Sequence, residues 1–114
     1  MKALFLAFIL ISFALLQVSD AAHLEIGSMA VARDPTGTVL GTDSTQSLEK
    51  LMDFVRNQDQ QGIKDLRRHG HLVDIKSGSK VKILSFDSSE NAYKVRVFGS
   101  GQEIWLIKET VLPK

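Results

Sequence analysis

The apolar residues between residues 45 and 70 recur at helical intervals. Those of the first helix are spaced three or four residues apart, so they share one face, while most charged residues fall elsewhere. They are Leu48, Leu51, Met52 and Val55. Asp43 or Ser44 can cap the start, because a side-chain oxygen there accepts a hydrogen bond from the first turn. The pattern predicts one amphipathic helix.

A second, shorter helix is predicted after the polar stretch NQDQQG. Asp59 is placed to cap it, and Ile63 and Leu66 fall on its inner face. Basic side chains before Gly70 suit the negative end of a helix dipole, and glycine readily takes the left-handed conformation that ends a helix. We therefore assign residues 45–70 to a helical segment.

From Leu72 onward the period changes to that of strands. The stretches LVDI, KVKILSF, AYKVRVF, EIWLIK and TVL are apolar or alternating, and polar or glycine-rich turns separate them. Lys80 and Lys82 are expected to face outward, after which Leu84 and Phe86 change the phase. Such a change predicts a bulge or bend. Four to five short strands predict a small, strongly bent barrel over residues 71–114.

Residues 22–44 show no sustained period. They contain scattered apolar residues, three glycines and one proline. We interpret them as an extended or flexible leader, part of which is compatible with an edge strand.

The strand region resembles a bacterial Src-homology-3-like (SH3-like) domain over about the last 45 residues. The resemblance lies in a lysine-rich turn before KVKIL, a polar loop, YKVRV, a glycine turn, a tryptophan-bearing strand and a terminal VL. The usual opening strand is missing beside GHLVDI, although VARDPTGTVLGT resembles it faintly, and Ile104, Trp105 and Leu106 replace the familiar GWV. The resemblance implies a small SH3-like barrel, and with the two helices predicted from periodicity the expected fold is α+β, two short helices followed by that barrel. The resemblance also implies a binding or scaffolding role in the cell envelope, often beside peptidoglycan, and brings no catalytic residues.

The amino terminus has the pattern of a secretory signal peptide. An uncharged apolar run from Ala3 to Leu16 is followed by small residues before a possible cut at Ala22, so residues 1–21 are assigned to it. The run is shorter than the roughly 20 residues of a membrane span, although an uncleaved anchor is the alternative. The chain has no cysteine, which excludes disulfides and thiol chemistry. An exported domain of this kind fits a bacterial periplasm or surface.

The charge distribution bears on possible partners. The net charge is only +1, with the excess of basic residues after Lys76, so the strong basic footprint of a nucleic-acid binder is absent. Anionic envelope polymers or an envelope protein are the expected partners, and no cofactor is expected.

A surface patch for such a partner is predicted from aromatic and cationic residues. Its members are Tyr93, Arg96, Phe98 and Trp105. The alternative interpretation places Tyr93 in the core, packs Trp105 against the helical segment and leaves Arg96 as a solvated strand residue.

A metal site is the remote alternative. The candidate ligands are His69, His71 and Asp74, of which only the two histidines resemble the first half of an HxHxDH metal-binding box. A zinc site needs more ligands on a rigid frame, and these histidines flank a glycine at a helix end. Three functional hypotheses follow: an exported noncatalytic binding domain, a small secreted inhibitor or immunity-type protein, and a metal-dependent hydrolase.

Overall fold

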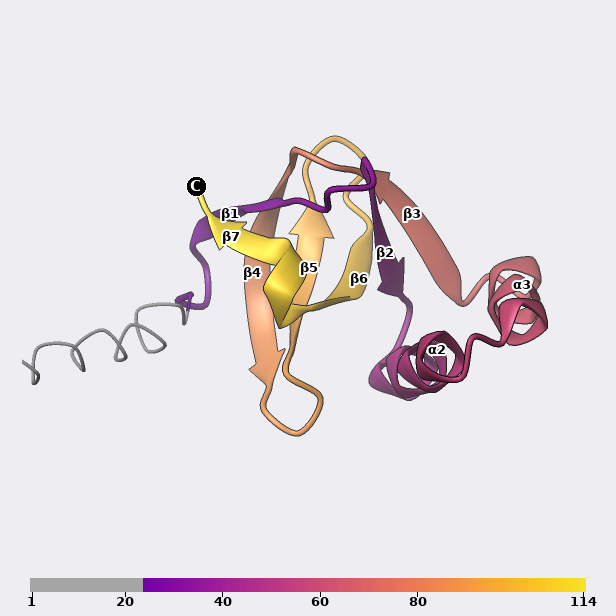
Figure 1. The fold of residues 1–114 in the computed structure, drawn as a ribbon. Coiled ribbons are helices and arrows are strands. Elements are labelled where there is room, and N and C mark those ends of the chain that lie inside the picture. Colours follow the sequence, from indigo (N-terminus) through magenta and orange to yellow (C-terminus); the bar gives the residue numbers. More distant parts are fainter. Residues whose placement is uncertain (1–23) are drawn as a thin grey trace, which may run out of the picture.

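Residues 24–114, described here by a computed structural model, form one antiparallel sheet with two helices beside it (Figure 1). The helices are α2 (Thr45–Arg56) and α3 (Gln60–Arg68), and a short 3-10 turn, η1 (Lys108–Thr110), precedes the last strand. The strands are β1 (Met29–Ala32), β2 (Thr38–Thr42), β3 (Leu72–Lys76), β4 (Ser79–Asp87), β5 (Ala92–Val97), β6 (Glu103–Ile107) and β7 (Val111–Pro113). The α+β class is confirmed. The predicted signal peptide lies outside the described residues.

The sheet is not closed, so the prediction of a complete barrel is wrong. The strand order is β3-β2-β6-β5-β4-β1-β7, with β3 paired only to β2 and β7 paired only to β1. Closure was expected because it hides both apolar faces and the edges. Instead, the sheet curls so that β1 and β7 lie in front of β4 (Figure 1), and the helices cover part of the outer face.

Two strands lie in the segment expected to be an extended or flexible leader. Strand β1 pairs with β4 and β7, and β2 pairs with β3 and, at Thr42, with Trp105 of β6. Neither is an edge strand. The two helices therefore connect β2 to β3 within the sheet rather than preceding all of its strands.

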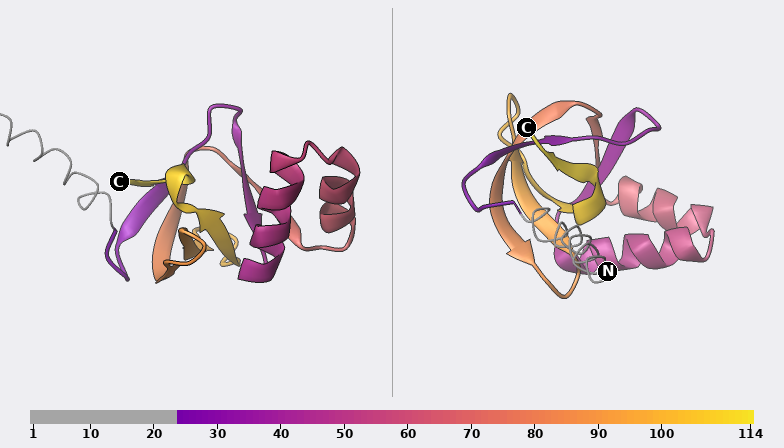
Figure 2. Two further views of the ribbon diagram at one scale, coloured as in Figure 1. Left: turned by 60° about the horizontal axis from the view of Figure 1, so that its bottom comes forward. Right: turned by 60° about the vertical axis from the view of Figure 1, so that its left-hand side comes forward.

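The ends of both helices follow the predicted chemistry. The Ser44 hydroxyl accepts a hydrogen bond from the Ser47 N–H at 3.1 Å, and the Asp59 carboxylate accepts one from the Gly62 N–H at 2.9 Å. Gly70 has φ +78°, in the left-handed region that ends a helix. Figure 2 shows the helices together at one end of the molecule, beside β2 and β3.

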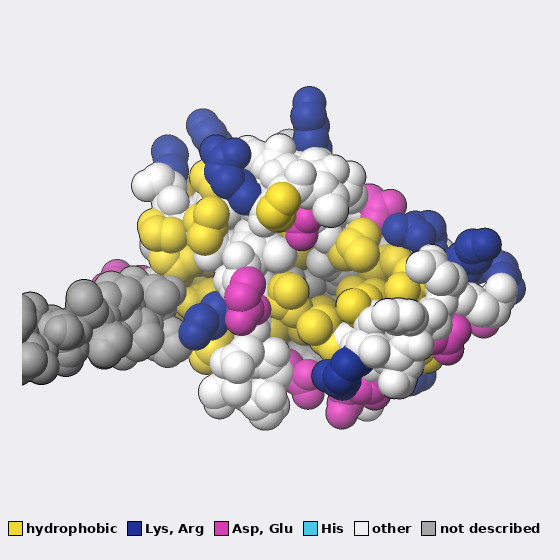
Figure 3. All heavy atoms as spheres, in the orientation of Figure 1, with side chains coloured by type: hydrophobic (Ala, Val, Ile, Leu, Met, Phe, Trp, Pro, Cys, Tyr) yellow, Lys and Arg dark blue, Asp and Glu magenta, His cyan; other side chains and the backbone are white. Residues whose placement is uncertain are grey.

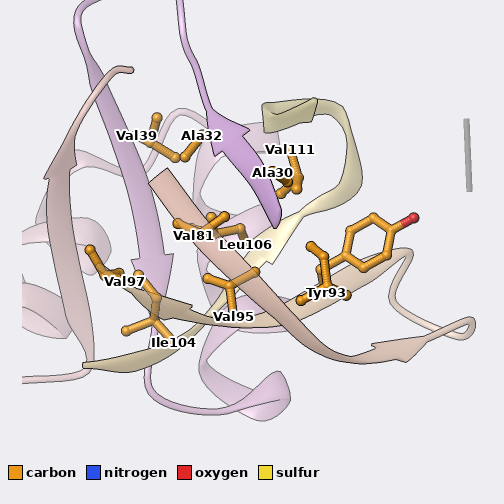
Figure 4. Packing of buried hydrophobic residues seen from close by; sticks show 11 residues of the cluster. Ala30, Ala32, Val39, Val81, Tyr93, Val95, Val97, Ile104, Leu106 and Val111 are labelled. Carbon is orange, nitrogen blue, oxygen red and sulfur yellow. The ribbon is translucent and has the colours of Figure 1, made fainter. Parts of the chain in front are cut away.

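The inner face of the curled sheet holds the larger core (Figure 4). Its buried residues are Ala30, Ala32, Val39, Val81, Ile83, Tyr93, Val95, Val97, Ile104, Leu106 and Val111. The predicted irregularity in β4 is confirmed, because its pairing with β5 shifts register between Ile83 and Ser85. This bulge lets one long strand serve a strongly bent sheet.

A second, smaller core joins the helices to the outer face of the sheet. Its buried members are Leu48, Leu51, Leu66, Leu72 and Ala92. Leu40, Phe54, Ile63, Trp105 and Ile107 pack against them while partly exposed. None of the helices in residues 24–114 is long and apolar enough to cross a membrane.

Candidate binding surface

The four residues of the predicted patch lie in different surroundings. Tyr93 is only 1% exposed and belongs to the larger core. Its hydroxyl accepts a hydrogen bond from the Leu24 N–H at 3.0 Å, and its ring centroid lies 4.9 Å from that of Phe86 in a tilted arrangement. The alternative interpretation of Tyr93 as a core residue is therefore confirmed, and this side chain is not available to a ligand.

Trp105 is also occupied by packing. It is half-buried against the smaller core, and in the β5–β6 register it stands opposite Lys94. Its large ring thus helps fix the helices on the sheet, as the alternative interpretation expected.

Arg96 and Phe98 remain accessible, and two lysines of β4 lie opposite them. Register pairs Lys82 with Arg96, and the Phe98 N–H donates to the Lys80 carbonyl at 3.0 Å. Val81, Val95 and Val97 point into the core, so alternation directs these four side chains outward. We call Lys80, Lys82, Arg96 and Phe98 the cationic face. Phe98 is 54% exposed, which is unusual for a large aromatic side chain.

One carboxylate neutralises part of this surface. Glu103 on β6 accepts hydrogen bonds from Arg96 Nη2 at 2.8 Å and Nε at 3.3 Å, and Lys94 Nζ lies 3.8 Å from its other oxygen. The hydrogen bond from Arg96 holds the pKa of Glu103 below its usual value. Within residues 24–114, no carboxylate lies at ion-pair distance from Lys80 or Lys82.

The pairing of Lys82 with Arg96 works against stability. Like charges directly opposite on neighbouring strands repel, and opposite charges there would attract. Figure 3 shows Lys and Arg side chains projecting from the upper margin of the molecule, at the end where β4 begins and β5 ends. Two uncompensated lysines beside an exposed aromatic ring form a surface suited to an anionic ligand.

The lysines of the cationic face were absent from the predicted patch. Their outward orientation followed from the alternation in KVKILSF, but only the strand pairing places Lys80 and Lys82 opposite Phe98 and Arg96. Sequence alternation identifies the face of a residue, whereas its cross-strand neighbour depends on register.

The three metal candidates each have a different partner. His69 Nδ1 lies 2.8 Å from the Asp65 carbonyl, His71 Nδ1 lies 2.9 Å from the Asp43 carboxylate, and Arg67 pairs with Asp74 at 3.0 Å. Both histidines line a hollow of about 260 Å³ between α2 and α3, but Asp74 does not. No group of three or more His, Asp or Glu side chains suited to a metal ion occurs in the described part of the chain.

Comparison of the chain with protein-family models, curated proteins and solved structures gave no match.

Proposed function

We propose that this protein is an exported, noncatalytic SH3-like domain that binds an anionic cell-envelope polymer through the cationic face. The observation that carries the proposal is the pairing of Lys80 and Lys82 with Phe98 and Arg96, with no carboxylate of residues 24–114 at ion-pair distance from either lysine. A polyanion would supply the missing negative charge, and Phe98 would pack against its less polar parts.

The strand arrangement supports the SH3-like part of this proposal. The stretches that carry the resemblance form β4, β5 and β6, which are consecutive neighbours in the sheet, and the short β7. We assign the opening strand, which is missing beside GHLVDI, to β1, because β1 lies between β4 and β7. The helices then represent an insertion between an early and a later strand.

The export part rests on the amino-terminal sequence alone. Its apolar run and small-residue cut site are typical of a signal peptide, and the absence of cysteine suits a bacterial periplasm or surface. Mass spectrometry of the protein recovered from the producing cells tests it: a mature chain starting at Ala22 is expected, and one starting at Met1 would contradict cleavage.

Cosedimentation with purified peptidoglycan and with purified anionic wall polymer tests binding. A basic residue near an anionic surface contributes about 1 kcal/mol, so the double substitution Lys80→Gln/Lys82→Gln should weaken binding by roughly tenfold or more. The matched control is Lys50→Gln/Lys64→Gln, which removes the same charge from exposed positions on the helices. Equal loss in both variants would show that net charge alone acts, and no binding by the unmodified protein would refute the proposal.

A further inference from the structure

The apolar face of α2 extends beyond the part of the sheet that covers it. Leu48 and Leu51 are 1% and 4% exposed, whereas Val55, one turn further on, is 50% exposed. Val55 borders a groove of about 150 Å³ between α2 and the end of β6. The groove is lined by Asp34, Leu40, Leu48, Leu51, Met52, Val55, Ile107 and Thr110. A hollow of about 150 Å³ with apolar walls can hold a benzene-sized group, so one apolar side chain fits this groove.

The single charged group in the groove is the carboxylate of Asp34. Its Oδ1 accepts hydrogen bonds from the Thr36 N–H at 2.9 Å and from the Thr36 hydroxyl at 2.7 Å. The Ser77 hydroxyl binds the Asp34 N–H at 3.0 Å, which ties this turn to the loop before β4. The hydrogen bonds from Thr36 lower the pKa of Asp34, so its side chain is an anion at neutral pH.

Asp34 also lines an adjoining hollow of about 430 Å³, with Arg33, Pro35, Ser77, Glu109 and Leu112. This hollow contains two carboxylates against one guanidinium. Neither Asp34 nor Glu109 forms an ion pair within residues 24–114. The groove and this hollow therefore share Asp34, and the hollow has one more carboxylate than guanidinium groups.

We propose that this groove binds a protein segment in which an apolar side chain is followed by a lysine or arginine. The apolar side chain enters between Val55 and Ile107. The basic side chain lies beside the carboxylates of Asp34 and Glu109. Charge complementarity selects this occupant, because the two carboxylates would repel the polyanion proposed for the cationic face. The groove is a second site, built from residues that the cationic face does not use.

Titration of the isotope-labelled secreted protein with synthetic peptides, followed by NMR, tests the proposal. Three peptides of about ten residues in a Gly/Ser background differ only in their central pair, which is Leu-Lys, Leu-Glu or Ser-Lys. The Leu-Lys peptide should shift the signals of Val55, Ile107 and Asp34. Burial of one apolar side chain is typically associated with about a tenfold or larger change in affinity, so the Ser-Lys peptide should bind at least about tenfold more weakly. The Leu-Glu peptide should also bind more weakly than Leu-Lys.

Variants locate the site. Val55→Glu should abolish the shifts, and because Val55 is half exposed the fold should tolerate this change. The matched control is Ile26→Glu, at an apolar position that is 63% exposed outside the groove. Asp34→Asn should weaken binding about two- to fivefold, as expected for an exposed ion pair. Shifts confined to other residues, equal binding of all three peptides, or a dimer that Val55→Glu converts to a monomer would each overturn the proposal. Polymer binding by Val55→Glu should remain, so this proposal and that for the cationic face can fail separately.

Discussion

At the scale of single residues, Lys82 is expected to favour binding over stability. Lys82→Glu places a carboxylate opposite Arg96 and replaces a repulsive cross-strand pair with an attractive one. Such pairs contribute roughly 0.2–1 kcal/mol, so the free energy of unfolding should rise by about that amount while polymer binding falls. Urea unfolding measures the first effect and cosedimentation the second. Lys82→Gln, which only removes the repulsion, should have intermediate stability, and a less stable Lys82→Glu protein would contradict the assigned register.

The contact between Asp43 and His71 is expected to make stability depend on acid pH. The hydrogen bond from His71 is the main cause that lowers the pKa of Asp43 in the folded protein. A carboxyl group with a depressed folded pKa contributes stability above its unfolded pKa of about 3.9 and loses it as the pH falls toward the folded value. The contribution is small because both side chains are about half exposed.

His71→Ala should therefore be less stable than the unmodified protein at pH 5, and the difference should shrink below about pH 3.9. Thermal unfolding across this range measures it, and NMR titration should show the pKa of Asp43 moving up in the variant. His69→Ala is the control, since its ring contacts the Asp65 carbonyl rather than a carboxylate. A difference between the unmodified protein and His71→Ala that stays constant down to pH 3 would contradict this role.

At the scale of elements, the contact between α2 and α3 depends on Gly62. A Cβ atom at this position would lie 2.6–2.8 Å from three atoms of the Phe54 ring, closer than side chains normally approach. Gly62→Ala gains up to about 1 kcal/mol of helix propensity but displaces the ring, and overpacking typically costs about 1–3 kcal/mol. We expect a net loss of stability in urea unfolding. Gly62→Ala combined with Phe54→Leu should recover part of it, and a single variant more stable than the unmodified protein would contradict this packing.

Local signals predicted some elements and missed others. The caps and the helix end at Gly70 depend on neighbouring residues, so the sequence alone identified Asp59 and Gly70 and limited the first cap to Asp43 or Ser44, of which the structure shows Ser44. Strands β4, β5 and β6 were recognisable because they are apolar or alternating, and β4 pairs with β5 and β5 with β6, which are neighbours along the chain. Strands β1 and β2 are short and lie in a glycine-containing segment, and their pairing with β4, β7, β3 and β6 involves distant parts of the chain. Alternation within four or five residues does not reveal such partners.

At the scale of the whole molecule, the position of the helices and the curl of the sheet explain why Trp105 and Tyr93 of the predicted patch are occupied by packing. The apolar face of the helices needs a partner, and Trp105 on the outer face of β6 supplies part of it. Tyr93 lies on the inner face of β5, where curling of the sheet buries it. How the layers pack therefore determines which aromatic residues remain exposed. Phe98 belongs to the predicted patch, but only the strand pairing shows that Lys80 lies beside it.

The separation of the two proposed sites leads to an expectation for the intact protein. The cationic face carries positive charge on β4 and β5, whereas the groove is lined by α2, β6 and the Asp34 turn, so a polyanion and a basic peptide have different places to bind. The fraction of a labelled Leu-Lys peptide that sediments with the anionic polymer should therefore increase when the protein is added. The fraction that sediments without the protein measures direct attraction between peptide and polymer. Val55→Glu should release the peptide but leave the protein on the polymer, and Lys80→Gln/Lys82→Gln should reduce the sedimented fraction of both protein and peptide. The competition experiment is done at an ionic strength that screens charges over about 10 Å, so that long-range attraction between the two ligands does not contribute. If polymer and peptide displace each other from the protein under this condition, they share one surface, and the assignment of separate sites is wrong.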